Sequence, residues 1–338
     1  METLWFWIVA SALALYVVFD GFDIGAGIAW PFIRRDDADG DRILQSIGPF
    51  WDGNEVWLLA AGGLLYLAFP ELYATSMSGF FLPITLVLWL LILRGIGLEF
   101  RHQLQVPAWK GFWGFTFVGA SYGLALAFGA ALGNVVRGVP FNAEGRFFLP
   151  FLATGEAQHG ILDPYPLLVA VTALVVLGRH GAIWIGAKCH GALRERARRL
   201  ALQSTWPLLV LFLGLTLASF WIQPNLPARF TDSPLGAAFP AATLASLFLS
   251  MQALRRENEV QAFFASSTML VGLLGSAAFG VYPYVLPGIE AGTGLKVADT
   301  ITAAYGLETA LIWAVPGLLL VGIYFWILHR RFAGRIEN

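Results

Sequence analysis

The chain has 338 residues, of which 57% are hydrophobic and 13% are charged, and its formal net charge is −1. About a quarter of the residues of a typical soluble domain are charged, so this composition excludes an ordinary soluble protein. The near-zero net charge gives no indication of nucleic-acid binding. A single cysteine, Cys189, excludes an intrachain disulfide and a cysteine metal cluster. The composition indicates an all-α polytopic integral membrane protein.

Apolar segments long enough to cross a membrane follow one another along nearly the whole chain. Such a helix needs about 20 mostly apolar residues. No part of the sequence has the composition of a soluble domain or the alternation of a β-strand, so we expect residues 1–338 to form a single membrane domain. We expect nine spans, at about residues 4–32, 55–74, 79–100, 111–134, 164–187, 205–223, 236–254, 262–286 and 304–329.

The positions of lysine and arginine predict the orientation of these helices. With the N-terminus outside, 17 of the 21 basic residues fall on the cytoplasmic side. The outer side then holds Arg137, Arg146, Arg229 and Lys296. Basic residues collect on the cytoplasmic side of membrane proteins. An odd number of spans brings the C-terminus to the cytoplasm as well.

Two aspartates lie inside the first expected span, in the stretch FDGFDIGAG. Asp20 and Asp23 are three residues apart and therefore share one helix face. A charge inside the membrane costs about 2.5 kcal/mol or more even on the most lenient scale. Two interpretations are open, an interfacial pair and a protonatable pair that lines an internal path. The glycines Gly21, Gly25 and Gly27 would let another helix, a cofactor or a partner subunit approach closely.

The second expected span begins with a similar pair, Asp52 and Glu55, in the stretch GPFWDGNEVWLL. Acidic residues are common in the first turn of a helix, because the helix dipole stabilises them there. The residue pattern alone therefore leaves two roles open for this pair, a structural role at the helix start and a protonatable role.

Two further spans contain residues of a candidate polar network. Arg94 and Glu99 lie near the cytoplasmic end of the third span, where charged residues are ordinary. Arg94 lies about two turns inside, so we expect it to pair with an acidic residue. Arg179 and His180 lie about two turns inside the fifth span. A histidine at such a position either transfers protons or is a packing residue.

Ligands for haem or metal ions are scarce. The histidines are His102, His159, His180, His190 and His329. Haem iron is usually held by histidine, methionine or cysteine, and only His180 is expected within a span and away from its end. We therefore expect this chain to ligate no haem and no metal. Motifs of zinc sites, phosphate-binding loops and nucleophilic triads are absent from the sequence.

Four stretches together carry a family resemblance. They are, in this order, DGFDIGAG, PFWDGNEVWLLAAGG, LILRGIGLEFR and FGAALGNVVRGVPFN. The set resembles subunit II of the cytochrome bd family of quinol oxidases, with specific motifs in the first 145 residues and a looser similarity from HGAIWI to the C-terminus. The resemblance implies two four-helix bundles plus a peripheral helix.

The resemblance also implies a function in aerobic respiration. Complexes of this family, in the bacterial cytoplasmic membrane, oxidise a membrane quinol and reduce dioxygen to water. Two b-type haems and one d-type haem are expected in the partner, subunit I, with which subunit II forms a heterodimer. Some members hold a structural quinone, and some complexes have a small third subunit. Subunit II is expected to support the haem subunit and to help conduct cytoplasmic protons to the oxygen-reducing site.

The path residues implied by the resemblance are the second aspartate of DGFD and the aspartate of WDGN, which are Asp23 and Asp52 here. We expect Asp20 and Glu55 to tune the same path. Some relatives have glutamine where this chain has Glu55, so an acid is not required there. The connection at about residues 224–235 is compact, so quinone contacts of longer relatives are not carried over.

Two other functions are compatible with the residues. A proton-coupled secondary transporter would also place acidic residues in glycine-interrupted helices, but it would work without a haem partner. A purely structural subunit would use the aspartates for assembly rather than for proton transfer.

Overall fold

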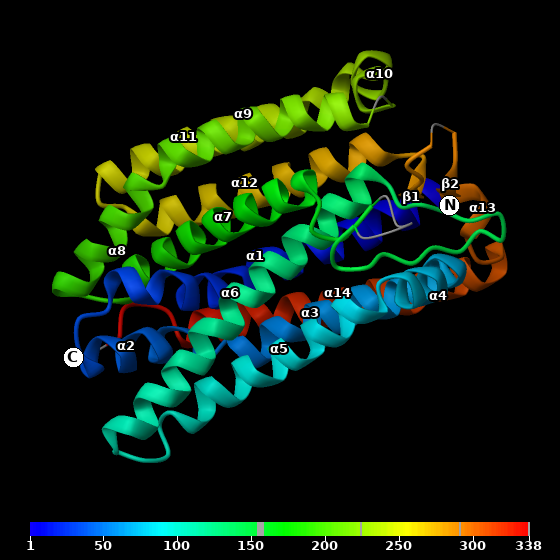
Figure 1. Ribbon diagram of the computed structural model, residues 1–338. Helices are drawn as coiled ribbons and strands as arrows, with labels where there is room; N and C mark the ends of the chain where they lie inside the picture. Colours follow the sequence, from blue (N-terminus) through cyan, green and yellow to red (C-terminus); the bar gives the residue numbers. More distant parts are fainter. Residues whose placement is uncertain (154–158, 224, 291, 337–338) are drawn as a thin grey trace.

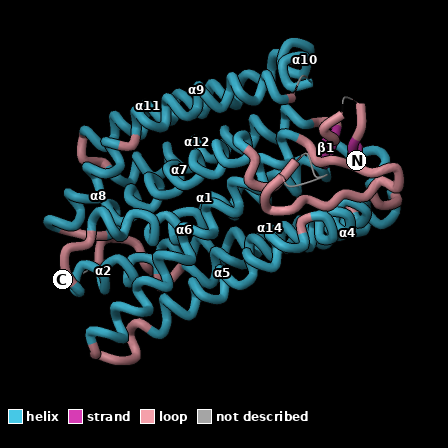
Figure 2. Tube along the Cα trace, viewed as in Figure 1, coloured by secondary structure: helices cyan, strands magenta, loops and turns pink. Residues whose placement is uncertain are grey.

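The structure is a computed structural model that describes residues 1–153, 159–223, 225–290 and 292–336. Long helices run side by side, and the loops gather at the two ends of the bundle, as Figure 2 shows. The two chain termini lie at opposite ends (Figure 1). We call these the N-terminal end and the C-terminal end of the bundle.

The first half of the chain forms one group of helices. Its elements are α1 (Glu2–Ile33), α2 (Asp37–Ile47), α3 (Trp51–Ala68), α4 (Pro70–Gly79), α5 (Phe81–Phe100) and α6 (Pro107–Arg137). The short helix α2 lies at the C-terminal end of the bundle, and α4 lies at the N-terminal end (Figure 1).

The second half forms a second group and a peripheral helix. Its elements are α7 (Pro164–Lys188), α8 (Gly191–Gln203), α9 (Thr205–Ile222), α10 (Asn225–Asp232), the 3-10 helix η1 (Pro234–Ala237), α11 (Ala238–Arg255), α12 (Glu259–Val281), β1 (Tyr284–Pro287), β2 (Gly294–Lys296), α13 (Val297–Thr300) and α14 (Ala304–Arg331). The two groups, α1, α3, α5, α6 and α7, α9, α11, α12, meet where α7 packs against α1 and α6.

The helices have the length and apolar character that membrane spans require. Within the described residues, eight helical segments pass this test, and the bent pair α3–α4 would make a ninth. This result confirms the predicted helical membrane class, and the eight or nine candidate spans agree with the predicted number of about nine. The helix α14 lies at the periphery, since only Leu307 and Phe325 of its residues are buried.

One predicted span is broken. The expected span 55–74 begins earlier, at Trp51, and is interrupted at Phe69, beyond which α4 is bent by 120° relative to α3. The cause is Pro70, because a proline has no backbone N–H and disfavours the helical conformation of the residue before it. Phe69 accordingly has φ of −135°.

The expected span 262–286 and the expected absence of β-strands were wrong in the same place. The helix ends at Val281, and residues 284–287 pair with residues 294–296 as a short antiparallel hairpin. Pro283 and Pro287 flank this change, and a proline cannot donate the hydrogen bond that an α-helix needs at each residue. Hydropathy alone did not reveal the change, because the segment remains apolar.

The glycines of the first helix pack inside the chain. A Cβ on Gly25 would lie 2.0 Å from the carbonyl oxygen of Leu177, and a Cβ on Gly181 would lie 2.2 Å from the Ala26 nitrogen. The helices α1 and α7 therefore cross with their backbones in contact, which only glycine allows. A Cβ on Gly27 would clash with α6 in the same way. Of the neighbours expected for these glycines, the structure confirms another helix, because Gly25 packs against α7 and Gly27 against α6.

Ion pairs hold the short helix α2 at the C-terminal end of the bundle. Arg196 of α8 contacts Asp39 at 2.5 Å, and Arg101 contacts Asp37 at 3.3 Å. Desolvation acts to raise the pKa of Asp37, but hydrogen bonds from Arg101 and Arg34 outweigh it and hold this pKa below its usual value. The ion pairs fix α2 against the ends of the long helices.

Candidate functional site

The acidic pair of the first helix lies between three helices. Asp20 and Asp23 are 0% and 1% exposed. Nη1 of Arg94, on α5, lies 2.7 Å from Oδ1 of Asp20. Nη2 of the same guanidinium donates a hydrogen bond to Oε1 of Glu55, on α3. Arg94 therefore joins α1, α3 and α5 inside the bundle through two carboxyl groups.

Asp23 has a different partner. Its Oδ2 accepts a hydrogen bond of 2.8 Å from Nδ2 of Asn54, and the same nitrogen donates to the carbonyl oxygen of Phe19 at 3.2 Å. Asn54 is fully buried. Within the described part of the chain, Asp23 forms no ion pair. Asp23 is thus held by a neutral amide, whereas Asp20 is held by a cation.

We call Asp20, Asp23, Asn54, Glu55 and Arg94 the acidic cluster. Several of its buried atoms have no hydrogen-bond partner among the described residues, including Asp20 Oδ2, Asp23 Oδ1 and Asn54 Oδ1. Buried polar atoms without a protein partner are commonly bound to ordered water. The cluster therefore has the capacity to bind water between α1 and α3.

The sequence did not single out two polar residues of this region. Asn54 precedes Glu55 in WDGNE. A neutral residue at the start of a helix is usually interpreted as structural, so the sequence offered no reason to select it. Tyr16 lies four residues before Asp20, on the same side of α1, and its buried hydroxyl has no partner among the described residues. The four-residue spacing was the one available signal for Tyr16.

The cluster opens toward the C-terminal end of the bundle. The Glu55 side chain is 27% exposed, and Asp52, one turn earlier in α3, is exposed. Gly53 lies under α14, because a Cβ there would be 3.0 Å from the hydroxyl of Tyr324. The structure shows no direct contact between Asp52 and Asp23. Glu55 lies one turn after Asp52 in α3 and is joined through Arg94 to Asp20 on α1.

The candidate polar network divides into separate parts. Glu99 is exposed and has no ion pair in the described part of the chain. Nε of Arg179 donates to the carbonyl oxygen of Ala201 at 3.1 Å, and its Nη2 donates to Ser250 Oγ at 2.7 Å. Neither residue shares a hydrogen bond with Arg94 within the described residues.

His180 is enclosed between helices. Its Nε2 lies 3.0 Å from the carbonyl oxygen of Val18, and its Nδ1 lies 2.9 Å from Ser266 Oγ. A carbonyl oxygen only accepts, so Nε2 carries the proton and Nδ1 accepts a hydrogen bond from Ser266. The ring stacks on Phe263 with a centroid distance of 4.8 Å. Both ring nitrogens are thus engaged.

His180, the one histidine expected within a span and away from its end, does not fit a haem site. Both nitrogens of His180 have partners, and Nδ1 of His329 donates to the carbonyl oxygen of Phe325 at 2.9 Å. His102 and His190 are exposed. No group of three or more histidine, cysteine, aspartate or glutamate side chains suited to a metal ion occurs in the described residues.

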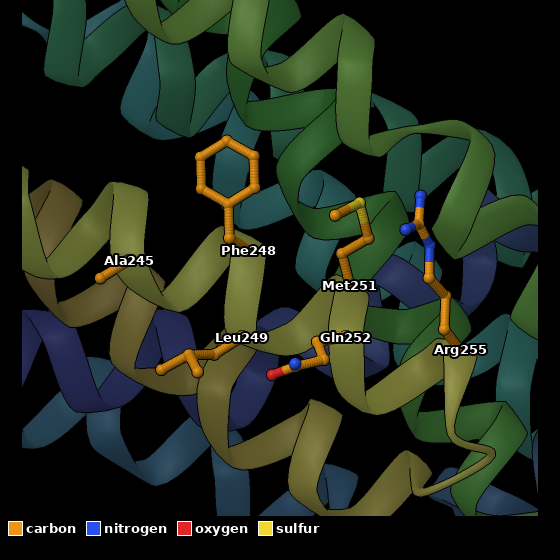
Figure 3. A pocket seen from close by; sticks show the side chains of 6 residues that line it. All are labelled: Ala245, Phe248, Leu249, Met251, Gln252 and Arg255. Atoms are coloured by element: carbon orange, nitrogen blue, oxygen red, sulfur yellow. The ribbon is translucent and has the colours of Figure 1, made fainter.

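A cavity of about 490 Å³ lies along α11, outside the acidic cluster. Figure 3 shows the side chains that line it, and all of them come from this one helix. They are Ala245, Phe248, Leu249, Met251, Gln252 and Arg255. Since no titratable group of the acidic cluster reaches this cavity, we locate the functional site at the cluster.

The fold and the cluster define a class of protein. It is a polytopic helical membrane protein that holds several carboxyl groups and one guanidinium between its helices, at a cost that membrane proteins usually accept only for function.

Comparison with known proteins identifies the family. The family model "Cytochrome bd terminal oxidase subunit II" matches residues 1–332, so the chain belongs to this family. It is therefore a subunit of a terminal oxidase, an oxidoreductase complex that contains haem and also includes subunit I. This membership does not support the alternative of a secondary transporter.

The sequence similarity to individual relatives extends over almost the whole length of each protein. The chain is 30% identical to the "Probable cytochrome oxidase subunit 2" of Haemophilus influenzae, covering 100% of this chain and 95% of that protein. It is 29% identical to "Cytochrome bd-I ubiquinol oxidase subunit 2" of Escherichia coli K12, covering 100% of this chain and 96% of that protein. Because these relatives are bacterial, we conclude that this chain is a multi-span membrane protein of a bacterial respiratory oxidase.

The fold is similar to a solved structure as well. A chain of the bd oxidase from Geobacillus thermodenitrificans superimposes with a TM-score of 0.78, at 18% identity, and the match covers 98% of each chain. This similarity confirms the predicted fold of two helix groups with a peripheral helix.

Proposed function

We propose that this chain conducts cytoplasmic protons toward the oxygen-reducing haem of a quinol oxidase and supports the subunit that holds the haems. The relatives from Escherichia coli and Bacillus subtilis are named ubiquinol oxidase subunits, which supports a membrane quinol as the electron donor. Following the family resemblance, we assign two b-type haems and one d-type haem to subunit I; the full engagement of both ring nitrogens of His180 supports this assignment.

One observation carries the proposal: the cluster holds three carboxyl groups between its helices, but its one guanidinium contacts only two of them. Asp20 and Glu55 both contact Arg94, and Asp23 has only Asn54. Uncompensated charge is very costly at such a site. The number of protons that the cluster holds is therefore closely tied to the charge around it, which is the property that a proton-transfer path needs.

The path begins at the C-terminal end of the bundle. Asp52 is exposed there, and Glu55 follows it on the same face of α3. In the proposed orientation this end faces the cytoplasm and the N-terminus lies outside the cell, in the bacterial cytoplasmic membrane. The surplus of lysine and arginine at this end supports that orientation.

From Glu55 the path continues past Arg94 to the pair on α1. Water bound at the unpartnered oxygens of Asp20, Asp23 and Asn54 would complete the connection. Asp23 is the final carrier on this chain, because no cation fixes its charge. The amide of Asn54 orients Asp23 by donating one hydrogen bond, and the second carboxyl oxygen remains available for the proton.

The experiment replaces each carrier with an amide of the same shape. Asp23→Asn and Asp52→Asn should each slow quinol-dependent oxygen consumption of the purified complex by about ten-fold or more, with quinol binding unchanged. The matched control is Asp232→Asn, because Asp232 is an exposed aspartate in α10 at the other end of the bundle. The control should be as active as the unmodified complex.

Two outcomes would count against the proposal. Unchanged oxygen consumption in both variants would exclude a role of Asp23 and Asp52 in proton delivery. Loss of haem absorption or of subunit I from the purified complex, with normal activity per remaining haem, would indicate the purely structural function instead.

A further inference from the structure

A second cavity, of about 220 Å³, lies at the C-terminal end of the bundle. It forms where the turn between α2 and α3, the last residue of α7 and the chain after α14 meet. Lys188, Arg331 and Arg335 line it together with Gln45 and Phe50. None of these residues belongs to the acidic cluster.

The walls of this cavity are held in place by the chain that follows α14. The backbone N–H of Ile336 donates to the carbonyl oxygen of Lys188 at 2.8 Å, and Lys188 Nζ donates to the carbonyl oxygen of Phe332 at 2.6 Å. Phe50 is 1% exposed, and Lys188 Nζ lies over its ring, 5.2 Å from the centroid. The cavity is therefore a built feature rather than a gap between mobile side chains.

The cavity carries an excess of positive charge. Among the residues that the structure describes, no aspartate or glutamate lines it. Within the described part of the chain, Lys188 and Arg331 form no ion pair. Arg335 contacts Glu259 at 3.3 Å, but Glu259 is already paired with Arg194 at 2.8 Å. Such a concentration of cations favours an anionic ligand.

The position of the cavity matches the level of lipid headgroups. The apolar side chains of α14 remain exposed up to its last turn, with Ile323 at 53%, Trp326 at 60% and Ile327 at 52%. Arg330 lies 5.2 Å over the ring of Trp326. Tryptophan and basic residues are typical of the membrane–water interface, so Arg331 at the rim of the cavity is at the interface too.

We propose that this cavity binds a phosphate group, carried by an anionic phospholipid or free in solution. Lysine binds phosphate as a point charge and arginine binds it through paired N–H donors, and both are present. A single bound water needs only about 10–15 Å³ of cavity volume. The volume of about 220 Å³ therefore has room for a phosphate group and bound water. Gln45, which also lines the cavity, offers a neutral donor.

The experiment measures binding of three probes to the purified, intact complex by native mass spectrometry. The probes are short-chain phosphatidylglycerol, phosphatidylcholine of the same chain length, and inorganic phosphate. The test variant is Arg331→Gln, because Arg331 is exposed and lines the cavity. The matched control is Arg330→Gln, since Arg330 is the neighbouring exposed arginine and does not line the cavity.

We expect phosphatidylglycerol to bind more tightly than phosphatidylcholine, and Arg331→Gln to weaken the phosphatidylglycerol binding by about five-fold. Arg330→Gln should bind it like the unmodified complex. Displacement of the lipid by millimolar inorganic phosphate would identify a soluble phosphate as the ligand, and persistence of the lipid would identify the phospholipid. Equal binding of both lipids, or equal binding by Arg331→Gln and Arg330→Gln, would overturn the proposal.

Discussion

The acidic cluster and the surroundings of His180 are two buried polar regions on opposite sides of α1, and they differ in how their polar groups are satisfied. In the acidic cluster, two of three carboxyl groups contact the one guanidinium, the third is held by an amide, and Asp52 is exposed nearby. Around His180, each ring nitrogen has one partner, Val18 or Ser266, and the ring is fully buried. A polar residue inside a span is therefore not in itself a proton carrier; an unbalanced charge with access to the surface is the distinguishing feature.

Arg179 supports the same distinction. It donates to the carbonyl oxygen of Ala201, near the C-terminal end of α8, where the helix dipole favours a positive charge. Its second donor contact, with Ser250, joins α7 to α11. Its Nη1 has no partner among the described residues, but the residue is 1% exposed, so Arg179 lacks the access to the surface that the acidic cluster has.

The largest effect is expected at Arg94. Arg94→Met would leave Asp20 and Glu55 without their shared counter-charge, and breaking a buried ion pair from one side costs roughly 3–5 kcal/mol. The thermal unfolding midpoint of the purified complex should fall markedly, and Arg94→Lys should retain part of the stability. A complex of Arg94→Met as stable as the unmodified one would show that the cluster does not depend on this pairing.

A smaller loss of stability is expected at His180. His180→Phe keeps an aromatic ring but removes both hydrogen bonds and leaves the buried Ser266 hydroxyl without its partner, at a cost of roughly 1–3 kcal/mol. Because the ring is a packing residue in this account, the dependence of oxygen consumption on pH between about 5 and 8 should keep its shape. A changed pH profile would place His180 among the proton carriers and remove the contrast between the two regions.

Glu55→Gln should have a modest effect on activity. The amide oxygen of glutamine can still accept the hydrogen bond from Arg94, and Asp20 still balances the guanidinium. Oxygen consumption should therefore slow by less than the roughly ten-fold expected for Asp23→Asn. If Glu55→Gln is slower than Asp23→Asn in the same assay, Glu55 is an obligatory carrier and the assignment of Asp23 as the final one is wrong.

The smallest effect is expected at Glu99. Its side chain is exposed and has no ion pair in the described part of the chain. Glu99→Gln should change the free energy of unfolding by no more than about 0.5 kcal/mol and leave oxygen consumption unchanged. A clear loss of activity in this variant would indicate a second path, beginning at the end of α5.

The sequence predicted the helices and the acidic pairs because both depend on local spacing. Apolar length marks a span, and a separation of three residues places Asp20 with Asp23 on one face. The ordered motifs around them also identified the family. These features can be read along one helix without knowing what lies opposite.

The partners across helices could not be predicted in this way. Nothing in the sequence indicates that Arg94 lies against Asp20 and Glu55 while Asp23 lies against Asn54, because these choices depend on how α1, α3 and α5 are rotated. The contact of Gly25 with α7 is another example, since a small residue fits equally well at a helix crossing and at an open surface.

The most direct test of the account is the rate of proton uptake during the reaction of the fully reduced, reconstituted complex with oxygen. We predict that Asp23→Asn slows proton uptake and oxygen reduction together, while His180→Phe takes up protons at the rate of the unmodified complex. Proton uptake by Asp23→Asn at the unmodified rate would contradict the account, because it would show that the acidic cluster does not deliver the protons.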